Sequence, residues 1–314
     1  MKIKIGISSC LLGEKVRYDG GHKHDAYLSN TLGAFFEYVS VCPEYEAGFG
    51  IPREAMRLVG APDSPRLMTQ KSGIDMTGRL EKWITKKLKE LEEKDLCGFI
   101  FKSGSPSSGM ERVKVYDSGG NARKSGSGLF AKAFMDRFSL IPVEDEGRLH
   151  DANLRENFIV RVFAFKRWKD LRNSNAAAKE LIEFHAQHKY LLMAHSPAVL
   201  KELGKLVASQ KKIGKSDFFQ RYETLFMKAL KQLSTVKKNA NVLMHMAGYF
   251  RERLLPEEKK ELFEVIELYR TGIVPLILPV TLIKHYVRVY GEEYLAGQCY
   301  IDPHPIELKL RNHA

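Results

Sequence analysis

Two cysteines and a serine-rich loop are the residues of this sequence whose types and spacing could do chemistry. Cys10 and Cys42 each follow a short apolar run, and a third loop of this kind, 103–109, reads SGSPSSG. A thiolate is a nucleophile and a ligand for soft metals, whereas the backbone N–H groups of a Gly/Ser turn can bind an anion. The pattern therefore favours a polar cleft with thiol chemistry, and it raises the question of why the third loop lacks a cysteine.

Three interpretations of these loops compete on chemistry alone. A zinc site could draw on Cys10, Cys42, His22 and His24, but no CxxC or HxxxH spacing supports it. A phosphate-binding loop would need the GxxxxGKS/T arrangement, which SGSPSSG lacks. A cysteine nucleophile with Glu44 or a histidine as its base fits the residue types, and it is generic.

The elements that must position these loops alternate between strand and helix. The expected strands are 2–8, 39–42, 98–101 and 139–143, and the expected helices between them are 28–38, 76–94 and 121–138. This alternation predicts an α/β domain with a mostly parallel, Rossmann-like sheet. Because parallel sheets bind ligands outside the carboxyl ends of their strands, Cys10, Cys42 and the third loop are expected to meet at one edge.

The second half of the chain has a different composition. Residues 1–150 are expected to form the α/β domain, and residues 151–314 an all-helical domain in which one helix spans 176–192. The helical part holds 27 Lys and Arg against 18 Asp and Glu, a net charge of +9, whereas the first part has +3. A basic domain attracts polyanions such as RNA, although a solvated basic helix surface explains the charge equally well.

Basic clusters in the helical half are the expected RNA contacts. Phosphates need such cations, and an aromatic ring among them could stack on an exposed base. The expected contacts are Lys166, Arg167, Trp168, Lys169, Lys211, Lys212 and Lys215. His185 and His188 stand at i, i+3, a spacing that can bind a metal; without a carboxylate or cysteine partner, a packed or surface pair is favoured.

The cysteine count and the N-terminal segment indicate the compartment. Four cysteines in 314 residues are too few and too scattered for a disulfide framework. The opening MKIKIGISSC alternates polar and apolar residues without the features of a signal peptide, and no stretch has the roughly eighteen unbroken apolar residues of a membrane helix. We expect a cytoplasmic protein.

Longer motifs surround the three loops. They read ISSCLLGEKVRYDGGHKHD, VCPEYEAGFGIPRE and FKSGSPSSGMERVKVYD. These segments resemble the signature loops of the thiouracil desulfidase family, and the second half, with FHAQHKYLLMAHS and YIDPHPIELKLRN, is similar to a helical domain often fused to that module. The two-domain arrangement resembles that of bacterial desulfidases of 4-thiouridine in transfer RNA. The resemblance implies an enzyme that converts this base to uridine, with tRNA as its partner and neither DNA nor a membrane.

The resemblance also implies a 4Fe-4S cluster held by three cysteine thiolates, with the fourth iron open to the substrate sulfur. Two ligands map onto Cys10 and Cys42. The third maps onto Ser108, because the family loop reads Ser-Pro-Ser-Cys-Gly where this chain reads Ser-Pro-Ser-Ser-Gly. A hydroxyl is a far poorer iron ligand than a thiolate, so the cluster is expected to be labile or absent. Cys97 precedes the third strand and is expected at the opposite edge.

Three explanations of Ser108 stay open. It is a substitution made to disable the protein or keep it free of the cluster, a natural change marking a desulfidase without activity, or an alkoxide that ligates iron. The near-isosteric change in an intact loop favours the first. The alternative functions are a non-catalytic RNA-binding protein and a desulfidase of free thiouracil or thiouridine, and the latter would not need the basic second domain.

The chemistry of the remaining site residues, together with the family resemblance, suggests their roles. Glu44, two residues after Cys42, is the expected base that activates or orients water. Ser105 is expected either to hydrogen-bond the ring or leaving sulfur or to cap a turn. Substrate contacts are expected from Asp19, His22, His24, Arg53 and Arg112. The two arginines are expected either to hold a phosphate or to pair with Glu44, and a salt bridge is the favoured role for each.

Overall fold

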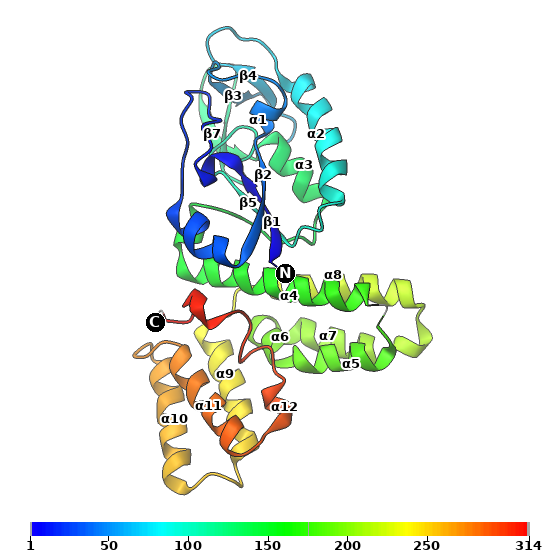
Figure 1. The fold of residues 1–314 in the computed structure, drawn as a ribbon, viewed down its shortest axis with the longest axis vertical. Coiled ribbons are helices and arrows are strands. Elements are labelled where there is room, and N and C mark those ends of the chain that lie inside the picture. Colours follow the sequence, from blue (N-terminus) through cyan, green and yellow to red (C-terminus); the bar gives the residue numbers. More distant parts are fainter. Residues whose placement is uncertain (1, 175, 313–314) are drawn as a thin grey trace. The chain divides into compact units, whose positions relative to one another are not determined.

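The fold was analysed in a computed structural model that describes residues 2–174 and 176–312. The chain divides into two compact units, Met1–Asp151 and Ala152–Ala314. The first is an α/β unit and the second is helical (Figure 1). Within the described residues, no helix combines the length and hydrophobicity needed to cross a bilayer.

The main sheet of the α/β unit has four parallel strands in the order β2-β1-β5-β8. Their bounds are Ile3–Ser8 for β1, Phe36–Val41 for β2, Gly98–Phe101 for β5 and Val143–Asp145 for β8. The expected parallel α/β architecture is confirmed. The fourth strand begins later than the expected 139–143, because the chain after the preceding helix first makes a turn in which Ile141 N–H donates to Phe138 O.

A second sheet was not expected. Its order is β4-β3-β6-β7, and only the central β3–β6 pair is parallel. The bounds are Met56–Val59 for β3, Arg66–Thr69 for β4, Val113–Tyr116 for β6 and Ala122–Gly126 for β7. The expected helix 121–138 is therefore wrong in its first part. A tight turn in which Asp117 Oδ1 accepts the N–H groups of Gly119 and Asn121 folds this segment back onto β6.

Two further helix expectations have different outcomes. The helix expected at 76–94 is confirmed as α2, Thr77–Glu92. The helix expected at 28–38 is wrong, because only short helical turns span 27–34 and the chain then enters β2. Phe36 pairs with Ile3 in the sheet, so sheet formation takes residues that the apolar pattern assigned to a helix.

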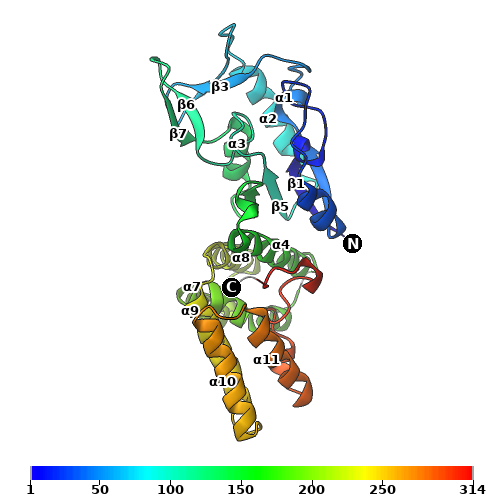
Figure 2. The same ribbon diagram turned by 90° about the vertical axis from the view of Figure 1, so that its left-hand side faces the viewer.

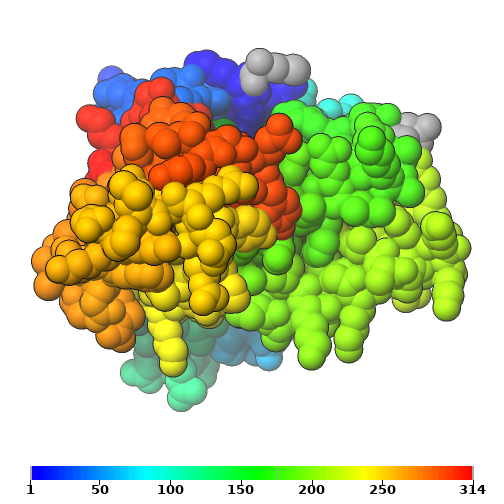
Figure 3. All heavy atoms as spheres, turned by 90° about the horizontal axis from the view of Figure 1, so that it is seen from below, coloured from blue at the N-terminus to red at the C-terminus, as the bar shows by residue number. Residues whose placement is uncertain are grey.

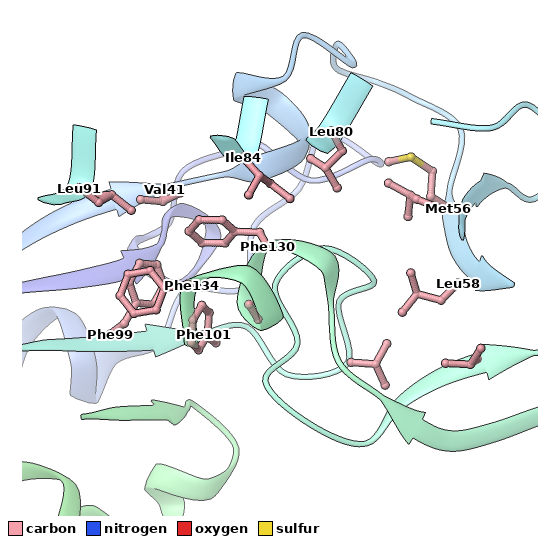
Figure 4. Close-up of a cluster of buried hydrophobic side chains, with 14 of the residues drawn as sticks. Val41, Met56, Leu58, Leu80, Ile84, Leu91, Phe99, Phe101, Phe130 and Phe134 are labelled. Atoms are coloured by element: carbon pink, nitrogen blue, oxygen red, sulfur yellow. The ribbon is translucent and has the colours of Figure 1, made fainter. Parts of the chain in front are cut away.

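The core of the α/β unit is formed by buried side chains of both sheets together with two helices, α2 and α3, Leu129–Arg137. Phe99 and Phe101 of β5 stack with ring centroids 4.3 Å apart, and Phe130 and Phe134 of α3 pack against them (Figure 4). Gly6 of β1 leaves room for this cluster, since a Cβ atom there would lie 2.2 Å from the Phe99 ring. This packing fixes β1 and β5 side by side, and with them the loops that follow.

The second unit is built of α-helices with short connections and ends in a segment of turns, 297–312. Its helices are α4 Ala152–Asn173, α5 Ala178–Gln187, α6 Lys189–His195, α7 Pro197–Ala208, α8 Lys215–Lys231, α9 Val236–Ala247, α10 Pro256–Arg270, α11 Ile277–Val289 and α12 Glu293–Ala296. α10 and α11 pack against α9 (Figure 2), and α8 and α10 lie at opposite ends of one face of this unit (Figure 3). The helix expected at 176–192 is interrupted at His188, which ends α5.

Candidate active site

The carboxyl ends of β1, β2 and β5 open into a cavity of about 380 Å³. All three loops line it, because β1 lies between β2 and β5 in the sheet. The cavity is lined by Cys10, Cys42, Glu44, Ser105 and Ser108, among others. The convergence expected from the order of strands is therefore observed.

The first loop presents Cys10 on a single 3-10 turn, Ser9–Leu12. Gly13 ends this turn with a left-handed φ of 93°, which a residue with a side chain adopts only at a cost. The Cys10 carbonyl accepts the N–H of Lys23 at 2.9 Å, so the loop returns to the cysteine. Burial raises the pKa of the Cys10 thiol, against the opposing effect of the Lys102 and Arg17 charges.

The second loop presents Cys42 at the start of a short helix, α1, Pro43–Glu46. The Cys42 N–H donates to Glu46 Oε1 at 2.8 Å, and its thiol donates weakly to Val16 O at 3.8 Å. Burial raises the pKa of this thiol to about 11. Both thiols are therefore protonated at neutral pH in the metal-free chain, and a metal would have to displace the protons.

Glu44 is held on both of its oxygens. Arg53 donates from Nε at 3.0 Å and from Nη2 at 2.6 Å to Oε2, while Ser107 Oγ donates to Oε1 at 2.8 Å. Arg53 Nη1 also donates to Val16 O and Gly50 O, each at 3.0 Å. The salt bridge favoured from the sequence is thus present. With 7% of its side chain exposed, Arg53 is better suited to positioning Glu44 than to contacting substrate.

The serine-rich loop is a hydrogen-bonded turn organised by Ser105. Its Oγ accepts the N–H groups of Ser107 at 3.3 Å and Ser108 at 3.1 Å, which is the turn-capping role considered for it. Ser108 is only 4% exposed and lines the cavity. In the part of the chain that the structure describes, the Ser108 hydroxyl has no hydrogen-bond partner. The hydroxyls of Ser105 and Ser107, by contrast, both form hydrogen bonds.

The structure adds Lys102 and Glu146, which sequence reasoning missed. Lys102 Nζ forms an ion pair with Glu146 and donates to Ser103 Oγ at 3.1 Å, and Ser103 donates to Glu146 from N and Oγ at 2.7 Å. Burial opposes ionisation of Glu146, but these hydrogen bonds outweigh it and lower its pKa. Lys102 follows β5 directly and Glu146 follows β8 directly. The rule that ligands bind at the carboxyl ends of strands already applied to Lys102, whose strand was expected correctly, and it would have identified Glu146 had the fourth strand been assigned correctly.

Other expected site residues do not join the cysteines. Asp19, His22 and His24 are exposed and do not line the cavity, whereas Lys23 of the same loop does. His24 Nε2 instead contacts Ser29 Oγ at 2.8 Å, and Asp19 accepts the N–H of Gly21 at 3.0 Å. These side chains therefore lie on the outer side of the loop.

Two further expectations concern residues outside this cavity. Arg112 lines an adjoining groove and forms no salt bridge with Glu44 in the described residues. Cys97 is buried at the start of β5, at the opposite edge of the sheet from the cavity, as expected.

In the basic cluster at 166–172, three of the residues expected to contact RNA are instead packed or bonded within the helical unit. Trp168 is 0% exposed and stacks on Tyr222 at 4.8 Å, so it cannot stack on a base. Arg167 donates to His188 Nε2 at 3.2 Å and to Pro303 O at 3.0 Å, and Lys169 is 8% exposed. The helical period turns these residues toward the core despite their charge. Lys166 forms an ion pair with Asp170 and stays partly exposed.

The second basic cluster and the histidine pair have separate outcomes. Lys211, Lys212 and Lys215 are exposed, and their RNA contact stays a prediction. His185 Nδ1 contacts Tyr222 Oη at 3.1 Å, whereas His188 is buried and stacks on Phe184 at 4.0 Å. Burial lowers the pKa of His188 to about 3. The pair is therefore packed, as favoured, and is not a metal site.

The donor set of the cavity can be compared with the cluster that the loops imply. Within residues 2–174 and 176–312, no group of three or more His, Cys, Asp and Glu side chains is arranged to hold a metal ion. Cys10 and Cys42 offer two soft sulfur ligands, and Ser108 offers a hard, weakly acidic oxygen at the third position. The residues present therefore do not fit a cluster held by three thiolates.

Comparisons with known protein families match both halves of the chain. Residues 5–146 match the family described as 2-thiouracil desulfurase. Residues 189–305 match a family described as a protein of unknown function, DUF1722.

Individual relatives match parts of the chain at similar identity. The uncharacterized protein YbgA of Escherichia coli K12 is 30% identical over 158 residues, covering 50% of this chain and 94% of YbgA. The uncharacterized protein YbbK of Bacillus subtilis 168 is 30% identical over 131 residues, covering 40% of this chain and 85% of YbbK. A solved structure of a protein titled 4Fe-4S-dependent thiouracil desulfidase TudS matches at 29% identity and a TM-score of 0.39, covering 48% of this chain and 94% of that one.

Proposed function

The chain belongs to the 2-thiouracil desulfurase family through residues 5–146, and from this premise we propose that it takes a thiolated uridine as its substrate, namely 4-thiouridine in tRNA. The observation that carries the proposal is the meeting of Cys10, Cys42, Glu44 and Ser108 in one cavity. A planar base fits a cavity of about 380 Å³.

The proposed reaction is a hydrolytic exchange at the thiocarbonyl carbon. Water supplies the oxygen, the C–S bond breaks, and the two protons of water leave with sulfur as hydrogen sulfide, so no oxidant or reductant is consumed. Arg53 fixes Oε2 of Glu44, Ser107 donates to Oε1, and Glu44 lines the cavity. In this proposal Glu44 orients the water and accepts its proton.

We further propose that this chain, as it stands, holds an iron–sulfur cluster weakly or not at all. Cys10 and Cys42 would supply two thiolates, and the hydroxyl of Ser108 occupies the third position. A cluster, when bound, would supply a Lewis-acidic iron for the substrate sulfur. Since an oxygen ligand binds iron–sulfur clusters poorly, Ser108 disables the site in this proposal.

The tRNA part of the proposal rests on charge. The helical half carries a net charge of +9, and Lys211, Lys212 and Lys215 are exposed on it. Such cations neutralise phosphates and release their counterions. A tRNA-modifying role implies a cytoplasmic location, which is proposed with it.

The test is anaerobic reconstitution of the parent chain and of Ser108→Cys with iron and sulfide, followed by desulfuration of tRNA that contains 4-thiouridine. We expect the Cys variant to hold about one 4Fe-4S cluster and to convert the base, because it completes three thiolates. The parent should hold little iron and show no turnover. Cluster absorbance and nucleoside chromatography measure the two outcomes separately.

Ser108→Ala is the matched control. If the serine alkoxide ligates iron, the parent will hold a cluster that Ser108→Ala loses, and the disabled-site interpretation is then wrong. If Ser108→Cys holds no cluster and has no activity, the desulfidase proposal fails. Thiolated tRNA that still binds would then favour a non-catalytic RNA-binding protein, the second candidate, because Ser108 stands where a third thiolate would complete the cluster site.

A further inference from the structure

A second cavity of about 520 Å³, here called the groove, adjoins the first within the α/β unit. The two share a wall made of Met56, Gln70, Ser103, Gly104 and Pro106. Strands β3, β6 and β7 of the unexpected second sheet form much of its lining. The two cavities are therefore immediate neighbours.

The groove is rich in positive charge that the protein does not neutralise. Its charged lining consists of the cations Arg57, Arg112, Lys114, Lys124 and Arg148 and the acids Glu111 and Asp145. Arg148 is paired with Glu111 at 2.9 Å and Glu144 at 2.6 Å. In the described part of the chain the other four cations form no ion pair.

Two details of the groove indicate an anionic ligand. Lys114 and Lys124 are direct cross-strand partners in the antiparallel β6–β7 pair, an arrangement of like charges that destabilises a sheet unless an anion lies between them. The Arg57 guanidinium lies over the Tyr116 ring, 4.8 Å from its centroid, and its buried Nε has no hydrogen-bond partner. Stacking holds this planar group with donors unused, which suits the fork-like recognition of a phosphate.

The first cavity differs in this respect. There Arg53 is paired with Glu44, Lys102 with Glu146 and Arg17 with Asp19, and in the described residues Lys23 is the one lining cation without an ion pair. Paired cations attract anions weakly, whereas unpaired ones attract them over several ångströms. In the described residues the groove is thus lined by four unpaired cations, against one in the first cavity.

We propose that the groove binds the phosphate groups attached to the nucleoside whose base enters the first cavity. This inference rests on the proposed function, because it takes the occupant of the first cavity to be a nucleoside. The phosphate chemistry is the same for a free mononucleotide and for an RNA backbone, and the test separates these two sources.

The experiment measures dissociation constants of the full-length chain by calorimetry. The ligands are uridine, 4-thiouridine, the 5′-monophosphate of each, and a trinucleotide with 4-thiouridine in its centre. The groove variant is Lys114→Gln/Lys124→Gln, which removes a repulsive pair and should fold at least as well as the parent. The matched control is Lys82→Gln/Lys89→Gln, which removes two exposed charges from α2.

In the parent and in the control, we expect each monophosphate to bind about tenfold more tightly than its nucleoside. The groove variant should lose most of this difference and keep its nucleoside affinity within about twofold. Equal affinities for nucleotide and nucleoside, an unchanged preference in the groove variant, or absence of nucleotide binding would each overturn the inference.

The two proposals fail in distinguishable ways. Preference for thiolated over ordinary uridine tests the proposed function, while preference for nucleotide over nucleoside tests the groove. A trinucleotide that binds more tightly than the monophosphate, with a steeper dependence on salt, identifies the RNA backbone as the phosphate source. Equal affinities of the two identify a free nucleotide.

Discussion

The two units of this chain use polar side chains in opposite ways. In the α/β unit, Cys10, Cys42 and Glu44 stand at strand ends and line a cavity of about 380 Å³. The helical unit has a surface hollow of about 610 Å³ against α8, lined mostly by exposed side chains, whereas its buried polar groups near His195 enclose only about 20 Å³. The difference teaches that residue type alone does not identify a reactive site, and that the element carrying the residue decides whether it meets ligand or core.

The closed network of the helical unit illustrates this. Asn239 Oδ1 accepts from the Tyr300 hydroxyl and Nδ2 donates to the Tyr269 hydroxyl, both at 3.1 Å. His195 Nδ1 lies 2.6 Å from Gln232 O. Such satisfied buried groups specify packing rather than catalysis.

The largest effect is expected from breaking the ion pair that positions Glu44. Arg53→Met should lower the free energy of unfolding of the α/β unit by about 3–5 kcal/mol, because it leaves a largely buried carboxylate without its partner. Hydrogen exchange of amides in α2 and β5 measures this, and amides in α8 of the same sample report the helical unit, which should be unchanged.

Glu44→Gln/Arg53→Met is the control for that prediction. Removing both charges should recover part of the lost stability, because no uncompensated charge stays buried. If Arg53→Met alone is as stable as the parent, Glu44 is solvated enough to need no partner. The ion pair then contributes nothing to the stability of the α/β unit.

The next effect concerns acid stability and should appear in the helical unit. Burial lowers the pKa of His188 to about 3 and that of His195 to about 4, from an ordinary value of 6.5. The unfolded chain therefore binds protons below pH 6.5 that the folded unit does not, so stability falls as pH drops from 6.5 toward 4. The loss is at most about 1.4 kcal/mol per histidine and pH unit.

The chain offers a probe for each unit, since its two tryptophans are Trp83 in α2 and Trp168 in α4. Trp83→Phe leaves Trp168 as the reporter of the helical unit, and urea titrations at several pH values measure its stability. His195→Gln should flatten the pH dependence. A helical unit equally stable at pH 6.5 and pH 4.5 would contradict the buried, neutral state of these histidines.

The smallest effect on stability is expected from the exposed lysines of the helical unit. Lys211→Gln/Lys212→Gln should change the free energy of unfolding by no more than about 0.5 kcal/mol. It should weaken tRNA binding and reduce the slope of log affinity against log salt by about 0.7–0.9 for each phosphate that the variant no longer neutralises. Lys201→Gln/Lys205→Gln, on exposed positions of α7, is the matched control. Equal weakening of tRNA binding in both variants would reduce the effect to net charge alone.

The position of the site, at the carboxyl ends of the parallel strands, could be predicted from sequence because short apolar strands and amphipathic helices alternate. That order alone brings Cys10, Cys42 and Ser108 together. The second sheet could not be predicted, because β7 reads ARKSG with four exposed residues and lacks the apolar alternation of a strand. Its stability comes from pairing with β6, which is a tertiary effect.

The wrong expectations for Arg167, Trp168 and Lys169 have another cause. The charge of this segment suggests an exposed surface, yet the helical period places Trp168 beside Phe184 and Tyr222 in the core. Lys and Arg reach the surface through long side chains, so a charged sequence does not exclude a buried helix face. The ion pair of Lys102 with Glu146 was missed for want of a correctly assigned fourth strand.

The central claim is that the first cavity receives the thiolated base, and photo-crosslinking of the unmodified full-length chain tests it most directly. 4-Thiouridine in RNA forms covalent bonds with neighbouring side chains under long-wave ultraviolet light, independently of any cluster or turnover. Mass spectrometry should find the crosslinks in the cavity segments 8–10, 16–18, 41–44 and 102–108. Efficient crosslinks confined to other segments, or to the helical unit, would contradict the claim.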